Sequence, residues 1–424
     1  MSSTVLTLTD IRILDPESGT DVIGHLRIED GRIADFGPNC TIAGTSLQGQ
    51  GLCVAPGLID MRVTTGEPGR ENRETLATAA EAASAGGVTS MVVMPGTDPV
   101  LDDMALIDYV TRRGENLSVN VLVAGALTKG MDGETMTEIG LMQQAGAIMF
   151  ASGKSPIRDA QIMRRLLSYS ASFNALISNH CMTPDLSNGT VAHESDFSSR
   201  LGLSGAPAIS ERLMAERDIA LAELTGGRVL LDLISSADVL PVIRRAKAKE
   251  LDVSASVSIN HLAMNELDIG DYRTFAKLEP PLREESDRQA LLAAINDGTI
   301  DIIVSDHDPR PAGEKRLPYA DASPGAVGLE LLLAAGLSQI ADGGLDLLPF
   351  LAALTCNPAD LLGLEAGRIK TNAIADLVIF DRHEPWVCDA SELRSRSKNT
   401  PFDGRRLTGR VQHTIKAGKL VYSA

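Results

Sequence analysis

Imidazole and carboxylate side chains stand at the ends of several apolar runs in this 424-residue sequence. His180 and His261 end two of these runs, and Asp306 ends a third, directly before His307. Histidine nitrogens and carboxylate oxygens bind divalent metals, and both groups also transfer protons in catalysis. These residue types therefore indicate metal-assisted or acid–base chemistry, provided that the fold brings the ends of the runs together.

Eight apolar, β-like runs recur through the middle of the chain, and helical patterns lie between them. The runs cover residues 52–60, 87–95, 119–127, 147–152, 175–180, 229–235, 253–261 and 300–306. The helical patterns include residues 71–85, 159–172, 211–225, 237–249 and 286–297. Apolar runs that alternate with amphipathic helices are typical of parallel strands covered by helices. Eight such units over about 250 residues predict a (β/α)₈ barrel of the TIM type, whose chemistry lies where the strands end.

The two ends of the chain have a different character, because both predict short strands joined by turns. Residues 5–9 and 25–29 alternate with a period of two, and Asp30-Gly31 is a hairpin signal. Residues 375–380 and 409–415 also predict strands. Neither end is large enough to bury a core of its own. We predict that residues 1–54 and 363–424 form one composite β-sandwich domain, and that residues 55–362 form the barrel.

Longer motifs give the chain a family resemblance that extends nearly from end to end. The motifs include PGLIDM, EPG, AAEAASAGGVTSMVVMPGT, GALTKG, AERDIALAE, PPLREESDR, SDHDP and, near the C-terminus, ADLVIFD. On these motifs the chain resembles the dihydroorotases of the amidohydrolase superfamily. In that family two metal ions in the barrel mouth activate a hydroxide that attacks the cyclic amide of dihydroorotate. The resemblance thus implies a hydrolase scaffold of pyrimidine biosynthesis.

The metal-ligand positions of that family are mostly changed in this sequence. The residues that replace the family's ligands are Arg62 and Thr64 for the His-x-His pair, Ser152 or Gly153 for the bridging residue, and Leu233 for the histidine of strand six. Arginine stays protonated, and a threonine hydroxyl is a poor substitute for imidazole. Only His180 and Asp306 match ligand positions, whereas catalytic zinc takes three protein ligands. We therefore expect no metal and no other cofactor.

Two arrangements could still provide a metal ligand or a catalytic base at these positions. Lys154 follows the fourth run closely and could replace the bridging residue. His180 and Asp306 could form a mononuclear site, completed by Asp232 or His307, and Asp306 would be the only surviving candidate base. If this active alternative holds, zinc is the expected metal.

The substrate-binding positions that the resemblance implies are also mostly lost. The arginine and the asparagine that bind the substrate carboxylate correspond to Gly66 and Gly96. A second asparagine corresponds to Glu279, whose charge would repel an anionic substrate. Only His261 remains. A cation that replaces a metal ligand suggests a further expectation, namely that Arg62 pairs with Asp306 or Asp60 in the space of the metals.

Composition excludes several other classes of protein. The chain has 39 Lys+Arg and 56 Asp+Glu, a formal net charge of −17, which disfavours nucleic acid and anionic membrane surfaces as partners. No apolar run is long enough to span a bilayer. The five cysteines are scattered and never form a C-x-x-C pair, which is typical of reduced thiols in the cytoplasm.

Three functions remain open at this point. The first is a non-catalytic, dihydroorotase-like protein of pyrimidine biosynthesis, a pseudoenzyme that acts as a structural partner of aspartate carbamoyltransferase. The resemblance implies this partner, and it also implies that the chain forms a homo-oligomer or a hetero-oligomer. The second is an active dihydroorotase or other cyclic amidohydrolase with an atypical metal site. The third is a scaffold whose altered barrel mouth binds another ligand. The changed ligand positions favour the first over the second.

Overall fold

The computed structural model describes residues 5–424, so residues 1–4 of the predicted composite domain lie outside the described residues. Eight parallel strands form the larger unit, and they follow one another around it in chain order. These strands are β6 (Leu58–Val63), β7 (Val88–Val93), β8 (Asn120–Ala126), β9 (Ala147–Ala151), β10 (Leu176–His180), β13 (Arg228–Asp232), β14 (Val253–Ser258) and β15 (Ile302–Val304).

The first and last of these strands meet, so that the sheet curls into a barrel. Val63 at the end of β6 forms a parallel bridge with His307, just after β15, and the Thr64 backbone N–H donates to the His307 carbonyl over 2.8 Å. The predicted (β/α)₈ barrel is therefore confirmed. Its closure brings the residues after β6 and β15 to the same place.

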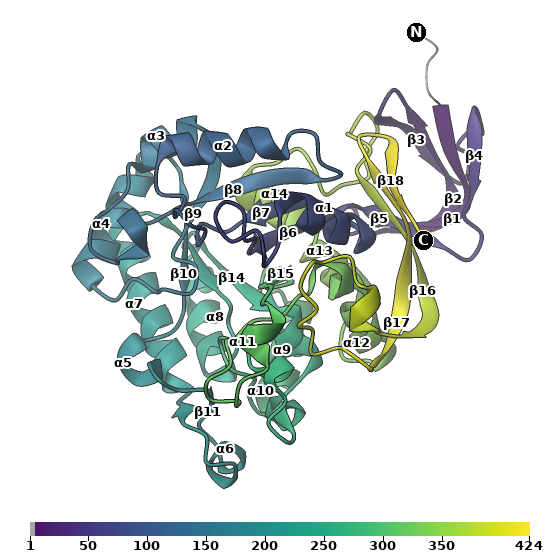
Figure 1. Cartoon of the computed structure of the whole chain (residues 1–424). Helices are drawn as coiled ribbons and strands as arrows, with labels where there is room; N and C mark the ends of the chain where they lie inside the picture. The colour runs from purple at the N-terminus through teal and green to yellow at the C-terminus, as the bar shows by residue number, and fades with distance from the viewer. Residues whose placement is uncertain (1–4) are drawn as a thin grey trace.

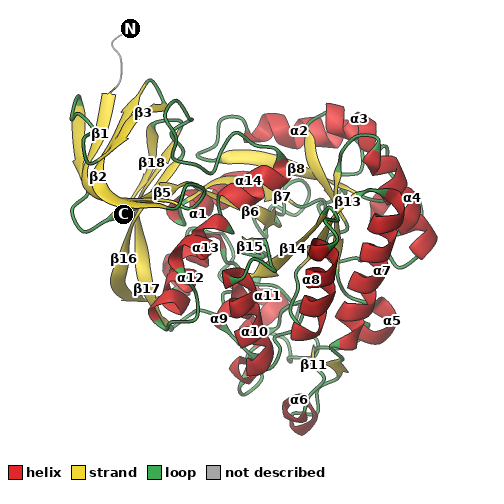
Figure 2. Cartoon of the chain, turned by 180° about the vertical axis from the view of Figure 1, so that it is seen from behind, coloured by secondary structure: helices red, strands yellow, loops and turns green. Residues whose placement is uncertain are grey.

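Helices surround the barrel on its outside (Figure 2). The longer ones are α1 (Leu76–Ala85), α2 (Met104–Gly114), α4 (Ala160–Ala171), α7 (Ile209–Thr225), α8 (Leu240–Ala248), α10 (Glu285–Asn296) and α12 (Leu332–Ala341). The shorter ones are α3 (Ile139–Gln144), α5 (Pro184–Ser187), α6 (Asp196–Arg200), α9 (Ile259–Ala263), α11 (Ala312–Lys315), α13 (Leu347–Ala352) and α14 (Cys356–Leu362). A two-stranded ladder of β11 (Ala192–His193) and β12 (Gly205–Ala206) lies in the excursion that follows β10.

Both ends of the chain contribute to a second, separate sheet. Figure 1 shows the N-terminal strands in purple beside the C-terminal strands in yellow, at one side of the barrel. The strands are β1 (Val5–Asp15), β2 (Thr20–Glu29), β3 (Arg32–Gly37), β4 (Thr45–Gln48), β5 (Cys53–Pro56), β16 (Leu377–Val387), β17 (Arg406–Lys416) and β18 (Lys419–Ser423). The order β18-β17-β16-β5-β1-β2-β3 places β5 against β16, so neither end completes the sheet alone. A separate, mostly β domain was expected and is present.

The apolar runs form barrel strands because both faces of each strand are buried. One set of side chains fills the inside of the barrel, among them Ile59, Met61, Val92 and Met149. The alternate side chains pack outward against the helices. Strands that are buried on two faces need apolar residues at nearly every position, which is why these runs do not alternate with polar residues.

Two of the predicted runs were wrong in their extent. The run 52–60 is not one strand, because it divides at Gly57 into β5 of the composite sheet and β6 of the barrel. A Cβ at residue 57 would overlap the Thr89 side chain, so the close crossing of the two units there requires glycine. The run 253–261 ends at Ser258, which caps α9, and His261 lies on that short helix.

Two of the predicted helices begin later than expected. The helix predicted over 71–85 begins at Leu76, because Thr75 caps it and forms a reciprocal capping box with Thr78. The pattern 237–249 starts with a 3-10 turn over Ala237–Val239, and the α-helix α8 follows from Leu240. In residues 5–424, no helix is both long enough and apolar enough to cross a membrane.

Candidate functional site

The ends of the barrel strands and the loops that follow them bring charged side chains from distant parts of the chain to the mouth of the barrel. Arg62 lies near the end of β6, and the strand register against β7 shifts between Asp60 and Val63. Asp232 ends β13, and Asp306 follows β15 with a φ of 49°. A shift in register changes the direction of the side chains near it, and here Arg62 lies among the ends of the neighbouring strands. All three side chains are almost inaccessible to solvent.

Arg62 is the centre of this cluster. Its Nε donates to Asp306 Oδ1 over 3.0 Å, and its Nη1 donates to Asp232 Oδ2. Ser256 Oγ donates to the other Asp232 oxygen over 2.9 Å. Burial acts to lower the pKa of Arg62, but the charges of Asp232 and Asp306 outweigh it and raise that pKa. The expected ion pair with Asp306 is therefore present. Asp60 accepts the backbone N–H groups of Arg62 and Ser305, and it does not pair with the Arg62 guanidinium.

Lys154 extends the cluster of charges. It follows Gly153, whose φ of 60° turns the chain after β9. The Lys154 Nζ lies 3.4 Å from Asp306 Oδ2 and 3.2 Å from Asp308 Oδ2, and Arg310 Nη2 lies 2.9 Å from the same Asp308 oxygen. Burial opposes ionisation of Asp308, yet these two cations lower its pKa to about 2. Three cations and three carboxylates thus alternate across the mouth: Arg62, Lys154, Arg310, Asp232, Asp306 and Asp308.

The two histidines of the mouth take no part in these ion pairs. Both ring nitrogens of His180 are buried without a hydrogen-bond partner among the described residues. Burial, together with the charges of Arg62 and Lys154, lowers the pKa of His180 to about 3. His261 Nε2 lies 3.2 Å from the Pro280 carbonyl, and burial lowers its pKa to about 4. Both imidazoles are therefore neutral at pH 7.

The other predicted site residues lie close by, but they have structural contacts. Ser152 Oγ accepts the backbone N–H of His180 over 3.0 Å. Leu233 packs into the core inside the barrel. The backbone takes up the space at Gly66, since a Cβ there would overlap the Arg70 carbonyl oxygen, whereas Gly96 has only the Met131 sulfur within 4 Å. No side chain of the kind that the family uses for a substrate carboxylate is present at either glycine.

The donor set of the mouth does not fit a hydrolytic metal. Arg62 and Lys154 occupy the sides of Asp306 that a cation would need, and neither side chain ligates a metal as an ion. Within residues 5–424, no group of three or more His, Cys, Asp or Glu side chains is arranged to hold a metal ion. His180 and Asp306, the two ligand positions that remain, have no third ligand, because Asp232 pairs with Arg62 and His307 instead faces Glu74 at 3.5 Å.

Sequence reasoning missed two features of this region. It did not assign Asp308 and Arg310 to the same charge cluster as Lys154, although the sequence places them directly after Asp306. It also missed a pocket of about 270 Å³ beside the cluster, lined by Glu279, Lys277 and the excursion after β10. No local signal indicates this pocket, because three loops that are distant in sequence form it.

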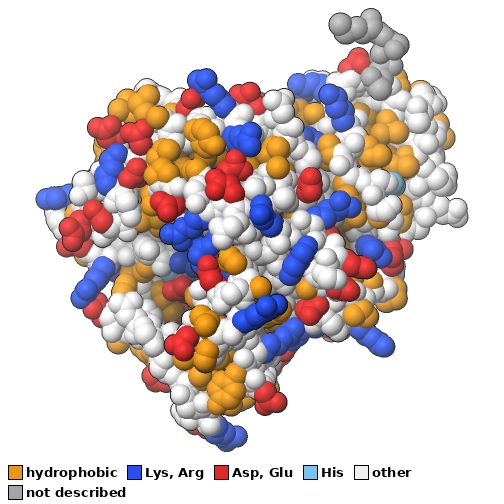
Figure 3. Space-filling view, in the orientation of Figure 1, with side chains coloured by type: hydrophobic (Ala, Val, Ile, Leu, Met, Phe, Trp, Pro, Cys, Tyr) orange, Lys and Arg blue, Asp and Glu red, His pale blue; other side chains and the backbone are white. Residues whose placement is uncertain are grey.

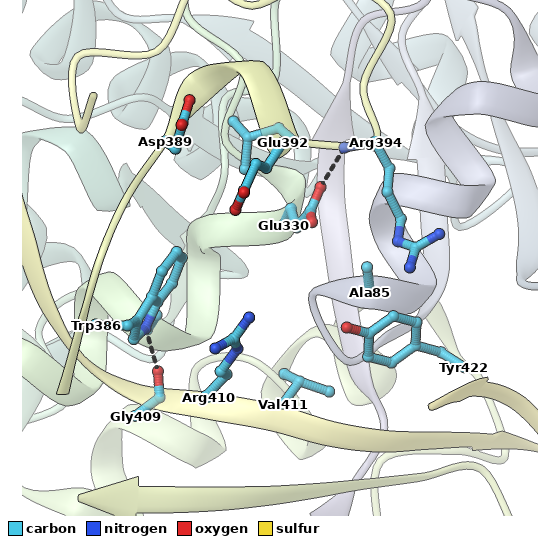
Figure 4. A pocket seen from close by; sticks show the side chains of 12 residues that line it. Ala85, Glu330, Trp386, Asp389, Glu392, Arg394, Gly409, Arg410, Val411 and Tyr422 are labelled. Carbon is cyan, nitrogen blue, oxygen red and sulfur yellow. Dashed lines mark hydrogen bonds between the residues drawn. The ribbon is translucent and has the colours of Figure 1, made fainter. Parts of the chain in front are cut away.

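A further pocket lies between the barrel and the composite sheet (Figure 4). Its volume is about 160 Å³. Arg410 lies 5.5 Å from the ring centre of Trp386, and Arg394 lies 5.1 Å from that of Tyr422. The partly buried Glu330 accepts the backbone N–H of Arg394 over 2.7 Å. The two ring contacts lie within the composite domain, the bond to Glu330 joins that domain to the barrel, and we assign this pocket a structural role. Figure 3 shows basic and acidic side chains interspersed over the face in view.

Comparison with known proteins gives consistent relationships. The family model for dihydro-orotase-like proteins matches residues 51–238. A protein of Anaplasma phagocytophilum named dihydroorotase is 38% identical, over 97% of this chain and 94% of its own length. One of Pelotomaculum thermopropionicum with the same name is 39% identical, over 96% of each chain. Among solved structures, the L-hydantoinase (dihydropyrimidinase) of Arthrobacter aurescens superposes with a TM-score of 0.89 at 23% identity, over 99% of this chain and 96% of its own. That likeness concerns the fold.

Proposed function

The chain belongs to the dihydroorotase family of the amidohydrolase superfamily, and from this premise we propose that it is a non-catalytic member of the family, with a structural role in pyrimidine biosynthesis. The observation that carries the proposal is the Arg62 guanidinium, which bridges Asp306 and Asp232 where the family's chemistry would need a metal. An active site of this family requires a Lewis acid and a hydroxide. A guanidinium between two carboxylates supplies neither.

Two further observations support the proposal. The side chains at Gly66 and Gly96 that would bind a substrate carboxylate are absent, and Glu279 introduces a negative charge near the mouth. His180 and His261 are neutral and buried, so neither provides a cation for an acidic substrate. Loss of the metal ligands and loss of the substrate contacts affect separate steps, yet both point to the absence of turnover.

The partner in this proposal is aspartate carbamoyltransferase, and its support is the resemblance to inactive chains that associate with that enzyme. All five cysteines are free and buried, which supports a reducing compartment such as the cytoplasm. Co-purification of the two proteins from their own host tests the partner. A chain that elutes separately from the transferase at micromolar concentrations of both would contradict it.

An active cyclic amidohydrolase is the second candidate, and the names of the relatives favour it. The two relatives described above are 38% and 39% identical to the chain, and both are called dihydroorotase. In this alternative the charge cluster would have to rearrange so that His180 and Asp306 gain a third ligand. Nothing in the packing of Arg62 provides space for that change.

Metal analysis of the purified protein, together with a dihydroorotase assay in both directions, distinguishes the two candidates. The matched control is the Anaplasma phagocytophilum relative, prepared in the same zinc-supplemented medium. We expect the control to hold zinc and to turn over dihydroorotate, and this chain to do neither. Stoichiometric zinc accompanied by turnover in this chain would overturn the proposal.

A further inference from the structure

The pocket beside the charge cluster is built from three loops at the functional end of the barrel. One wall is the excursion after β10, with Met182 and Val191. A second wall is the segment before α10, with Lys277 and Glu279, and the third is the loop around Ala320. Loops that follow the strands of a (β/α)₈ barrel form its ligand sites. Its volume of about 270 Å³ suits a small molecule.

The carboxylate of Glu279 is the unusual group in this pocket. Among the described residues it has neither a hydrogen-bond partner nor an ion-pair partner within 4.0 Å. Burial raises its pKa, and the charge of Lys154 opposes that effect. The three cations of the neighbouring cluster are already paired with Asp232, Asp306 and Asp308. Glu279 is therefore a partly buried carboxylate whose best partner is a cation from outside the chain.

Lys277 provides the opposite charge in the same pocket without pairing with Glu279. Its Nζ donates to the Ala320 carbonyl over 2.8 Å and lies 5.7 Å from the ring centre of Tyr319. An ammonium has three donors, so this one keeps two for a ligand. A simple amine would satisfy Glu279 but would leave a second cation close to Lys277. A ligand with both charges satisfies both residues and keeps the pocket neutral.

The rest of the lining is mainly apolar, with Leu278, Pro281 and Pro324 joining Met182 and Val191. We propose that this pocket binds a small zwitterion with a compact apolar body, such as a free aliphatic α-amino acid, its ammonium on Glu279 and its carboxylate on Lys277. The inference goes beyond the proposed function, because binding needs no hydrolysis and holds for an active or an inactive barrel.

Matched ligands test the proposal directly. The full chain is titrated with L-valine, with isobutylamine, which lacks the carboxylate, and with 3-methylbutanoate, which lacks the amine, and binding is followed by calorimetry and ligand-observed NMR. L-Alanine and L-leucine extend the series in size. We expect at least one of the amino acids to saturate the site, and the two singly charged analogues of valine to bind at least about tenfold more weakly than valine.

Variants then assign each end of the ligand. Glu279→Gln keeps the shape of the side chain and is expected to weaken the amino acid about tenfold while leaving 3-methylbutanoate unchanged. Lys277→Met removes the group that binds the carboxylate, so it is expected to weaken the amino acid about tenfold while leaving isobutylamine unchanged. Glu284→Gln, at an exposed carboxylate outside the pocket, is the control, and thermal unfolding curves verify that each variant folds.

Several outcomes would overturn the proposal. Isobutylamine binding as tightly as valine would indicate a site for cations alone, and an equal affinity for 3-methylbutanoate would indicate one for anions. No saturable binding of any of the three amino acids at millimolar concentration would remove the proposed ligand class. None of these results bears on turnover, so the metal and activity measurements above succeed or fail independently.

Discussion

Arg62 and Asp306 lie 244 positions apart in the sequence, and their side chains meet in the barrel mouth with 3.0 Å between Nε and Oδ1. The same guanidinium reaches Asp232, so one side chain joins the ends of β6, β13 and the segment after β15. A planar, permanently charged group with several donors is suited to two carboxylates at once. The interaction is buried, and removal of Arg62 leaves Asp232 without a cation and Asp306 with Lys154 alone.

Replacement of Arg62 by methionine should destabilise the fold strongly. Arg62→Met leaves Asp232 and Asp306 buried with no guanidinium, and breaking a buried pair in this way costs about 3–5 kcal/mol. Urea unfolding measures the loss. Arg112→Met, which removes the exposed i,i+4 pair with Asp108, should cost under about 1 kcal/mol. Equal effects of the two substitutions would show that the buried cluster is not held by Arg62.

Addition or removal of metal should leave the stability of the protein unchanged. A ligand that binds only the folded state raises the melting temperature, and chelation lowers it again. Because side chains supply the cations of the mouth, we expect the same melting temperature with EDTA, with no addition and with excess zinc. The relative from Anaplasma phagocytophilum, prepared in the same medium, is the comparison. A melting temperature that rises with zinc, with one or two ions taken up per chain, would favour the active alternative.

His193 should make stability fall in mild acid. It accepts from Arg283 Nη1 at 2.9 Å, and burial together with the Arg283 charge lowers its pKa below the ordinary 6.5, against opposing charges of Asp287 and Glu284. The unfolded chain then binds more protons below pH 6.5, so the free energy of unfolding decreases as the pH falls. The slope reaches about 1.4 kcal/mol per pH unit at most for one proton.

A comparison of urea unfolding at pH 7 and pH 5 checks this effect in two variants. His193→Gln keeps an acceptor for Arg283 but cannot be protonated, so part of the acid-induced loss should disappear. His383→Gln, at an exposed histidine, should behave as the unmodified chain does. An identical pH dependence in all three proteins would rule out His193 as the source.

Gly336 should tolerate no larger residue. It lies on α12 against Phe350, and a Cβ at this position would overlap the phenyl ring. Gly336→Ala therefore overpacks a closed core, at a cost of about 1–3 kcal/mol. Gly313 on α11 has nothing within 4 Å of the same added atom, so Gly313→Ala should be neutral or slightly stabilising. A loss of stability at Gly313 equal to that at Gly336 would contradict the packing argument.

Sequence reasoning predicts the barrel well, because strands buried on two faces carry a strong apolar signal. It fails at Gly57, since the apolar character continues without interruption from β5 into β6 while the chain passes from one sheet to the other. That change of partner depends on the close approach of Thr89, which is a tertiary contact. The end of β14 was misjudged for a similar reason, because the Ser258 cap divides a run that is apolar on both sides.

The candidate site was predictable in part. Replacement of a metal ligand by Arg62 suggested a partner carboxylate, and the pair with Asp306 is present. The position of Lys154 was not predictable, because a left-handed turn at Gly153 determines where the next side chain lies. The pocket around Glu279 depends on three loops that meet only in the folded chain. No local pattern in a single sequence indicates that three distant loops will form one pocket.

The pairing of β5 with β16 also determines when each part of the protein is able to fold during synthesis. All eight barrel strands leave the ribosome before Leu377 does, so the barrel has its complete set of strands while β5 still lacks its neighbour. Until β16 emerges, the first five strands expose an unpaired edge, which is the part of a nascent sheet most prone to aggregate. A nascent chain stalled before residue 377 would therefore be a better substrate for chaperones than the finished protein.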